Sequence, residues 1–123
     1  MFTGLIQALG TIRPLGGDRF DVSCREDNDA ILRDLAIGDS VAVDGICLTV
    51  ETILPQGFVA TASDETLYRT TLGQSEQAAP YVNLETSVRV GSKLGGHFVT
   101  GHIVGVGLLQ ASEKPPNQWK MSF

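Results

Sequence analysis

Apolar and polar residues alternate along much of the chain, in short stretches that are separated by turn residues. Residues 4–12 form an apolar run that stops before Pro14 and the pair Gly16-Gly17, and residues 20–24 alternate apolar with polar side chains. A period of two is typical of a strand with one buried face. We therefore predict two strands here, with a turn at the glycine pair.

The same pattern returns further along the chain. Residues 40–43 are mostly apolar, Asp44-Gly45 is a strong signal for a tight hairpin, and residues 47–53 form the return strand. Two more strands are predicted over residues 58–62 and 82–90. Many short strands separated by turns predict a closed barrel or a sandwich.

Two short segments have helical spacing instead. Ile31, Leu32 and Leu35 recur on one helical face behind Asp27 and Asn28. This spacing predicts a short helix within residues 25–35. A helical turn is predicted over residues 65–72. The expected class is therefore all-β, with one or two short helices.

The beginning of the chain recurs near its end. Residues 2–10 (FTGLIQALG) align with residues 99–107 (VTGHIVGVG) at an offset of 97 residues. Further on, residues 20–23 align with residues 119–122. One interpretation is chance similarity between glycine-rich strands, and the other is a true repeat. The repeat predicts one barrel over residues 1–97, the first strands of an incomplete second copy over residues 98–123, and a natural protein longer than the printed sequence.

Composition and charge exclude some classes of function. The chain has 123 residues, of which 42% are apolar, and a net charge of −5. It lacks the broad basic face that nucleic acid requires, and its charge disfavours an anionic membrane surface. Cys24 and Cys47 form no C-x-x-C pair, which argues against a metal site and fits a reducing cytoplasm. The sequence leaves open whether these two cysteines form one disulfide.

Several motifs, in a fixed order, carry a family resemblance. The chain opens with MFTG (residues 1–4), and GDSVAVDGICLTV occupies residues 38–50. The remaining blocks are DETL with TTLG (64–67 and 70–73), VNLE (82–85) and GGHFVTGH (95–102). In these motifs the chain resembles the N-terminal half of riboflavin synthase. The resemblance implies a six-stranded Greek-key barrel that binds a lumazine or flavin ring.

Chains of the riboflavin synthase family carry two similar barrels, which fits the repeat. The resemblance implies dismutation of two molecules of 6,7-dimethyl-8-ribityllumazine. One molecule transfers a four-carbon unit to the other, which yields riboflavin and 5-amino-6-(ribitylamino)uracil. The resemblance implies no metal and no organic cofactor. It also implies that each active site lies between the N-terminal barrel of one subunit and the C-terminal barrel of a neighbour in a trimer.

The expected partners follow from the same resemblance. They are the lumazine substrate and riboflavin, with lumazine synthase as a further candidate. We also predict self-association, with a dimer as the candidate state of this chain, because an unfinished strand pair and an apolar barrel mouth would otherwise face water. The second barrel's own binding motif is absent from the sequence. The expectation for this chain alone is therefore ring binding, and turnover stays open.

The chemistry of the implied reaction indicates which side chains are useful. The 7-methyl group of the lumazine is acidic because its anion delocalises into the heterocycle, so a modest base can remove the proton. His102 is a candidate base. The family motif places Ser40, Cys47 and Thr49 near the ring, where the acceptor molecule needs a nucleophile or an activated water. We predict Ser40, Cys47 and His102 as the catalytic residues.

Each of these residues also has a structural interpretation. Cys47 can act as a small buried hydrophobe, Ser40 can be a hydroxyl between a turn and a strand, and Thr49 fits a strand by propensity. His97 follows two glycines and is expected to be structural. His102 aligns with Leu5 in the repeat, and this change from an apolar side chain to an imidazole favours a function.

By resemblance, the ligand-binding residues fall into four segments. Strand backbone can pair with the pyrimidine edge of the ring. Phe2 can stack on the ring, while Glu65 and Thr66 line the ribityl end. The predicted binding residues are Phe2, Gly4, Leu5, Ile6, Cys47, Leu48, Thr49, Thr61, Ala62, Ser63, Asp64, Glu65, Thr66, Gly101, His102 and Ile103.

Two other functions stay open on sequence alone. One is a non-catalytic lumazine or flavin carrier, akin to the fluorescent lumazine proteins. The other is a β-barrel of a different kind, such as a sugar- or oligonucleotide-binding module. Aromatic residues make up only 7% of the chain, which counts against the nucleic-acid version because single strands are bound by stacking on aromatic side chains.

Overall fold

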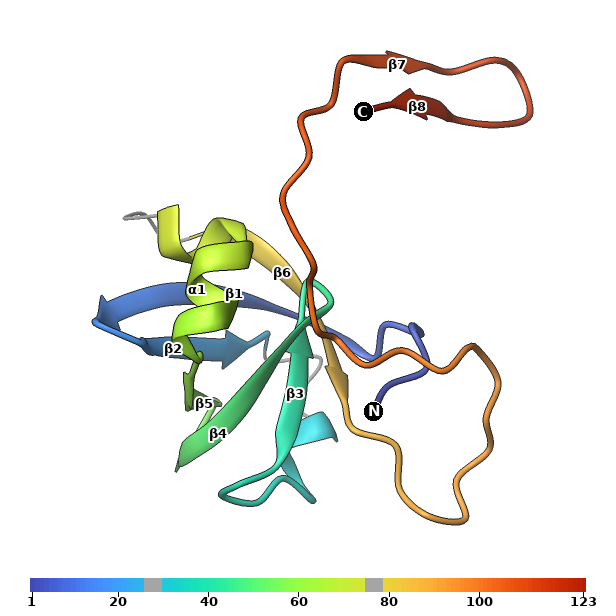
Figure 1. The fold of residues 1–123 in the computed structure, drawn as a ribbon. Coiled ribbons are helices and arrows are strands. Elements are labelled where there is room, and N and C mark those ends of the chain that lie inside the picture. Colours follow the sequence, from blue (N-terminus) through green and yellow to red (C-terminus); the bar gives the residue numbers. More distant parts are fainter. Residues whose placement is uncertain (26–29, 75–78) are drawn as a thin grey trace.

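Six strands close into an antiparallel barrel in the computed structural model, which describes residues 1–25, 30–74 and 79–123. Around the barrel the strand order is β1-β2-β5-β4-β3-β6, and β6 returns to pair with β1 (Figure 1). The strands are β1 (Ala8–Gly16), β2 (Arg19–Cys24), β3 (Ser40–Val43), β4 (Ile46–Leu54), β5 (Gly57–Thr61) and β6 (Ala79–Thr86). The predicted all-β class and six-stranded barrel are confirmed.

The barrel forms because apolar side chains alternate with polar ones, and the apolar set points inward. In β4, Ile46, Leu48 and Val50 are buried, whereas Cys47 and Thr49 between them are directed outward. All six barrel strands contribute to one hydrophobic cluster. Each large apolar side chain buried in this way contributes roughly 1.5–3 kcal/mol. The barrel is thus a rigid support for the residues on its outer face.

Asp44 and Gly45 make the tight turn between β3 and β4, with φ values of 49° and 81°. Both lie in the left-handed region that a type I′ hairpin demands. Asp44 also exchanges hydrogen bonds with Asn83: its carboxylate accepts from the Asn83 N–H at 2.7 Å, and its own N–H donates to the Asn83 carbonyl at 2.8 Å. The predicted hairpin is confirmed, and its register directs Cys47 outward.

Two of the predicted strands have different bounds in the structure. The first begins at Ala8 and not at residue 4, because Thr3 and Gly4 donate backbone hydrogen bonds to the side chain of Glu85. The last barrel strand ends at Thr86 and not at residue 90. Its neighbour β3 begins at Ser40, so no further β3 backbone remains to pair with it.

The helical segments are short. In α1 (Asp64–Arg69), Ser63 is the N-cap, and its side chain accepts from the Thr66 N–H at 3.2 Å. A 3₁₀ turn, η2 (Thr71–Gln74), follows. These elements confirm the helical turn predicted over residues 65–72.

The helix predicted within residues 25–35 is seen only as a 3₁₀ turn over residues 30–32. Residues 26–29, which include Asp27 and Asn28, lie outside the described residues. None of the helices in the described ranges is long and apolar enough to cross a membrane.

Residues 99–104, named here the covering segment, cross the outside of the barrel. Phe2 and Val99 exchange backbone hydrogen bonds of 2.7 and 3.0 Å as an antiparallel bridge. The carbonyl of Gly101 then accepts from the N–H of Cys47 at 2.9 Å. The covering segment is therefore fastened both to the N-terminal residues and to β4.

The end of the chain forms a hairpin of β7 (Ala111–Glu113) and β8 (Lys120–Ser122), which stands apart from the barrel in Figure 1. Residues 98–123, where the first strands of a second copy are expected, hold this short hairpin, whereas residues 101–110 are not in a strand. The physical reason is a shortage of neighbours. β1 pairs on both edges, with β2 and β6, whereas β7 pairs with β8 alone within the described part of the chain.

The two aligned segments, residues 2–10 and 99–107, share a local turn. Gly4 and Gly101 have φ values of 81° and 76°. The hydroxyl of Thr3 accepts from the N–H of Leu5 at 3.2 Å, and the hydroxyl of Thr100 accepts from the N–H of residue 102 at 3.4 Å. The aligned residues therefore have similar backbone geometry. The division of the chain at residue 97 stays a prediction.

Candidate functional site

An open groove with a volume of about 620 Å³ lies on the outside of the barrel. Its floor comes from β4 and β5, one wall from α1 and the other from the covering segment. Sites for small molecules and cofactors have volumes of roughly 300–1,000 Å³. This outer groove is lined by Cys47, Thr49, Thr61, Ser63, Glu65, Thr66, Arg69, His102, Ile103 and Val104.

The floor of the outer groove is polar because it uses the outward face of two strands. Cys47 and Thr49 are successive outward residues of β4. Thr61 of β5 faces Thr49 across the strand pair, so their side chains are neighbours. Cys47 is a half-buried free thiol, so no disulfide joins it to Cys24. The floor thus presents one thiol and two hydroxyls above the apolar interior.

The α1 wall carries hydroxyls and one ion pair. The hydroxyls of Ser63 and Thr66 lie 2.9 Å apart at the start of the helix. Glu65 and Arg69, one turn apart, form a hydrogen-bonded ion pair. Both side chains are partly exposed, so the pair adds little to stability. It nevertheless places a carboxylate and a guanidinium at the edge of the groove.

The covering segment fits against β4 because residue 101 is a glycine. Gly101 is buried, and its φ of 76° suits glycine. A Cβ at this position would lie 2.9 Å from the Cβ of Cys47 and 3.0 Å from the ring of Phe2. Both distances are too short for carbon atoms, so a side chain would lift the segment. Gly101 therefore allows His102 and Ile103 to form the second wall.

Eight of the predicted site residues meet in this groove. They are Cys47, Thr49, Thr61, Ser63, Glu65, Thr66, His102 and Ile103. Leu48 and Ala62 are only 1% and 4% exposed, because their side chains belong to the barrel core. A ligand can reach these two residues through their backbone alone. Asp64 begins α1 and is exposed outside the groove lining.

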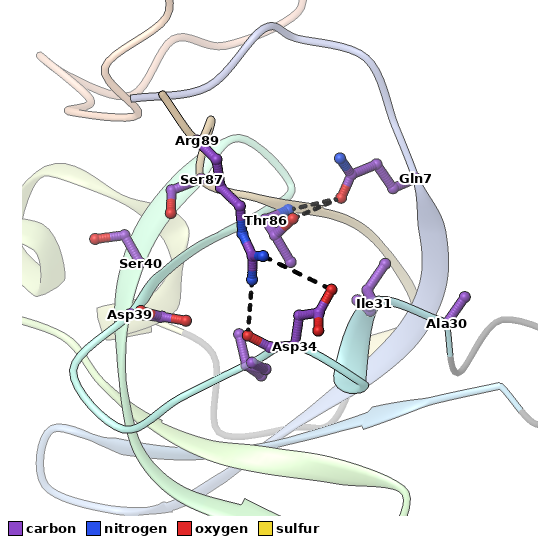
Figure 2. A pocket seen from close by; sticks show the side chains of 10 residues that line it. Gln7, Ala30, Ile31, Asp34, Asp39, Ser40, Thr86, Ser87 and Arg89 are labelled. Atoms are coloured by element: carbon purple, nitrogen blue, oxygen red, sulfur yellow. Dashed lines mark hydrogen bonds and ion pairs between the residues drawn. The ribbon is translucent and has the colours of Figure 1, made fainter. Parts of the chain in front are cut away.

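Ser40 lies in a different pocket, which Figure 2 shows from close by. This pocket has a volume of about 370 Å³ and lies between residues 30–39, the start of β3 and the end of β6. Arg89 reaches across it and donates to the carbonyl of Asp34 at 3.0 Å. The structure therefore brings Cys47 and His102 to one groove. Ser40 lines the other pocket, but it is the cross-strand partner of Thr49 in the groove floor, so its place in the site stays a prediction.

The predicted N-terminal binding residues also lie elsewhere. Phe2, Gly4 and Ile6 line a third pocket of about 420 Å³, beside the Asp44 turn. Phe2 is 1% exposed and packs beneath Gly101, so its ring has no free face for stacking in the outer groove. Leu5 is exposed and lines none of these three pockets.

Two residues of the outer groove were missed by sequence reasoning. Arg69 lines it, and its Nη1 donates a hydrogen bond of 2.8 Å to the carbonyl of Val104. The spacing of Glu65 and Arg69 on a helical turn was the available signal, since residues four apart face each other on a helix. Val104 contributes a backbone carbonyl to this contact, and no side-chain pattern indicates such a role.

The groove can hold a ligand with two kinds of surface. Four hydroxyls, from Thr49, Thr61, Ser63 and Thr66, can each donate and accept, as a polyol requires. Ile103 adds apolar surface for a ring. The nearby thiol of Cys47 and imidazole of His102 can take part in proton transfer or nucleophilic attack.

Comparison with known proteins defines the class of the molecule. Residues 3–87 match the family model of the lumazine binding domain. Among solved structures, LumP complexed with flavin mononucleotide superposes with a TM-score of 0.77 at 26% sequence identity, over 98% of this chain and 67% of that chain. LumP complexed with 6,7-dimethyl-8-(1'-D-ribityl) lumazine gives a TM-score of 0.72 at 25% identity, over 98% and 64%. The chain belongs to the lumazine-binding domain family.

Curated relatives narrow the class to one kind of barrel. The riboflavin synthase of Photobacterium leiognathi is 42% identical over 108 residues, which are 87% of this chain and 49% of the relative. That of Mycobacterium bovis is 38% identical over 98% of this chain and 60% of the relative, and that of Bacillus subtilis 35% over 95% and 54%. The barrel is riboflavin synthase-like, as the motifs predicted. The chain spans about half the length of these relatives.

Proposed function

We propose that this chain is the lumazine-binding barrel of a riboflavin synthase. The outer groove binds 6,7-dimethyl-8-ribityllumazine and riboflavin. The complete protein moves a four-carbon unit between two lumazine molecules, which yields riboflavin and 5-amino-6-(ribitylamino)uracil. The observation that carries this proposal is the outer groove itself, where residues of three separate family motifs meet.

In the proposal, the two kinds of surface in the groove recognise the two parts of the ligand. The hydroxyls of β4, β5 and α1 bind the ribityl chain, and the covering segment packs on the ring. Support comes from LumP, whose solved complexes hold this lumazine, riboflavin and flavin mononucleotide. His102 accepts the proton of the lumazine 7-methyl group, and Cys47 provides the nucleophile or holds a water. Ser40 lines the neighbouring pocket and pairs with Thr49 across β3 and β4, so it stays a candidate for a further catalytic hydroxyl.

We further propose that residues 98–123 begin a second barrel, which completes the active site. The matched turns at Gly4 and Gly101 support this division. The lengths of the relatives support it too, because this chain covers only 49–60% of them. In such a protein, residues 4–6 serve the groove of the second barrel, as residues 101–103 serve the first.

A non-catalytic carrier of lumazine or flavin is the second candidate. The structural similarity to LumP favours it, since the LumP structures are complexes with a bound chromophore. The same groove suits both functions, and turnover distinguishes them. For both candidates we propose a cytoplasmic protein, in keeping with the free thiol of Cys47.

The decisive experiment adds 6,7-dimethyl-8-ribityllumazine to the purified chain. Its fluorescence reports binding, and the growth of riboflavin absorbance reports turnover. We expect binding by this chain, and turnover once the chain includes a second barrel. Binding without turnover in the longer protein would favour the carrier. A folded sample that neither binds nor converts the lumazine would overturn the proposed function.

A further inference from the structure

Arg69 connects the two walls of the outer groove. From α1, its Nη1 donates a hydrogen bond of 2.8 Å to the carbonyl of Val104, at the end of the covering segment. Its Nε donates to the carboxylate of Glu65, one helical turn earlier. Because the guanidinium is planar and carries its donors in a fixed fork, one side chain can hold both partners at once.

The other backbone hydrogen bonds of the covering segment to the rest of the chain lie at its start and middle. Val99 pairs with Phe2, and the carbonyl of Gly101 accepts from the N–H of Cys47. Ile103 packs against the barrel core, but the side chain of Val104 is 85% exposed, so packing does little to hold Val104 itself. The hydrogen bond from Arg69 is therefore the contact that ties Val104 to α1 in the described part of the chain.

We infer that Arg69 is a positioning residue, which holds His102 and Ile103 at the outer groove by fastening Val104 to α1. These two residues lie between Gly101, held by Cys47, and Val104, held by Arg69. Releasing Val104 frees one end of this short stretch, so that His102 loses its position and Ile103 is held by its packing on the core alone. The carboxylate of Glu65 orients the guanidinium of Arg69 through their hydrogen bond. The consequence for ligand binding rests on the proposed function, whereas the effect on the covering segment does not.

An ordinary surface ion pair would behave differently. Exposed pairs one helical turn apart contribute little, so a purely local pair could be lost without any change in the groove. The chain offers a matched control in Arg13 and Asp21, which form an ion pair of 2.6 Å between β1 and β2. Neither residue lines the outer groove.

The thiol of Cys47 can report on the covering segment, because Gly101 lies against it. In the 123-residue chain without ligand, the rate of alkylation of Cys47 by iodoacetamide would be followed by peptide mass mapping. Binding of riboflavin would be titrated separately by fluorescence. We expect Arg69→Gln to raise the alkylation rate about five- to tenfold and to weaken riboflavin binding by a similar factor, as expected for the loss of a charge-assisted hydrogen bond. Arg13→Gln should change neither quantity, and both variants should melt close to the parent chain.

Gly101→Ala provides an independent way to lift the same segment, by steric conflict with Cys47 and Phe2. If Arg69 acts through the covering segment, adding Arg69→Gln to Gly101→Ala should increase alkylation less than additively. Additive effects would overturn the inference. So would an unchanged alkylation rate in Arg69→Gln, because weaker binding alone would mean that Arg69 touches the ligand directly. A parent chain that binds no lumazine or flavin would refute the proposed function, while faster alkylation would still support the positioning role.

Discussion

His102 aligns with Leu5 when residues 99–107 are matched to residues 2–10, so an imidazole stands at a turn where the N-terminal segment has an apolar side chain. Its backbone N–H is held by the hydroxyl of Thr100, and its side chain lines the groove that also contains Cys47. An imidazole gains and loses a proton near neutral pH, which suits removal of a proton from the lumazine 7-methyl group. The geometry therefore supports the proton-transfer role in the proposed reaction.

We expect His102→Ala to lower kcat of the complete protein by about 10²–10⁴-fold, the usual contribution of a positioned acid or base. The dissociation constant of riboflavin should change much less. Steady-state kinetics and a fluorescence titration of the same variant measure the two effects. His97→Ala is the matched control, since His97 lies outside the groove lining. Equal losses of turnover and binding would instead assign His102 to ligand binding.

At the scale of single elements, the two faces of β4 have different roles, one in the core and one in the outer groove. Leu48 is 1% exposed in the barrel core, and the next residue, Thr49, points into the outer groove. The two residues are neighbours in sequence, yet one acts on stability and the other on binding. The reason is the pleat of the strand, which sends successive side chains to opposite faces.

This division predicts opposite outcomes for two substitutions. Leu48→Ala should lower the free energy of unfolding by about 2–5 kcal/mol, because it removes buried carbon atoms and leaves a cavity. Thr49→Val should leave the free energy of unfolding nearly unchanged and weaken riboflavin binding about two- to tenfold, through the loss of one hydrogen bond. Denaturant unfolding and fluorescence titration would separate the two effects.

Thr52→Val is the control for the groove, since Thr52 is an exposed residue of β4 outside the lining. It should alter neither quantity. An unchanged affinity in Thr49→Val would remove Thr49 from the proposed site.

At the scale of the whole molecule, the hairpin of β7 and β8 exposes apolar side chains. Trp119, Met121 and Phe123 are 59%, 52% and 79% exposed. In the repeat they align with Phe20, Val22 and Cys24 of β2, all of which are buried in the barrel. An isolated two-stranded hairpin is marginal in water, and its apolar face is more stable when covered.

We therefore expect the chain to self-associate through this hairpin. Sedimentation velocity at about tens of micromolar should show a dimer or a larger species. Replacing Trp119, Met121 and Phe123 together by serine should shift the distribution to monomer and leave the barrel folded, because these side chains lie outside its core. A parent chain that sediments as a single monomer would contradict this prediction.

The sequence predicted the barrel well because the period of two is kept in β1, β2 and the first half of β4, and turn residues separate the shorter apolar strands. The Asp44-Gly45 turn could also be predicted from the sequence, because a turn with positive φ at two successive residues favours this dipeptide. The strand ends were predicted less well, because they depend on which neighbour is present. β1 begins only at Ala8, because the side chain of Glu85, 81 or 82 residues away in sequence, accepts hydrogen bonds from Thr3 and Gly4. No local sequence pattern reveals such a contact.

By itself, the sequence determined the alternation that builds the barrel, the turns, the repeat and the family motifs, because all of these depend on the order and type of nearby residues. Only the tertiary structure decided which motif residues share a site. It brought His102 to Cys47 through the glycine at position 101, placed Ser40 in a neighbouring pocket beside Thr49, and revealed that Arg69 joins the two walls. These relations depend on distances across the barrel. Such distances are fixed only when the sheet closes and the covering segment crosses over it.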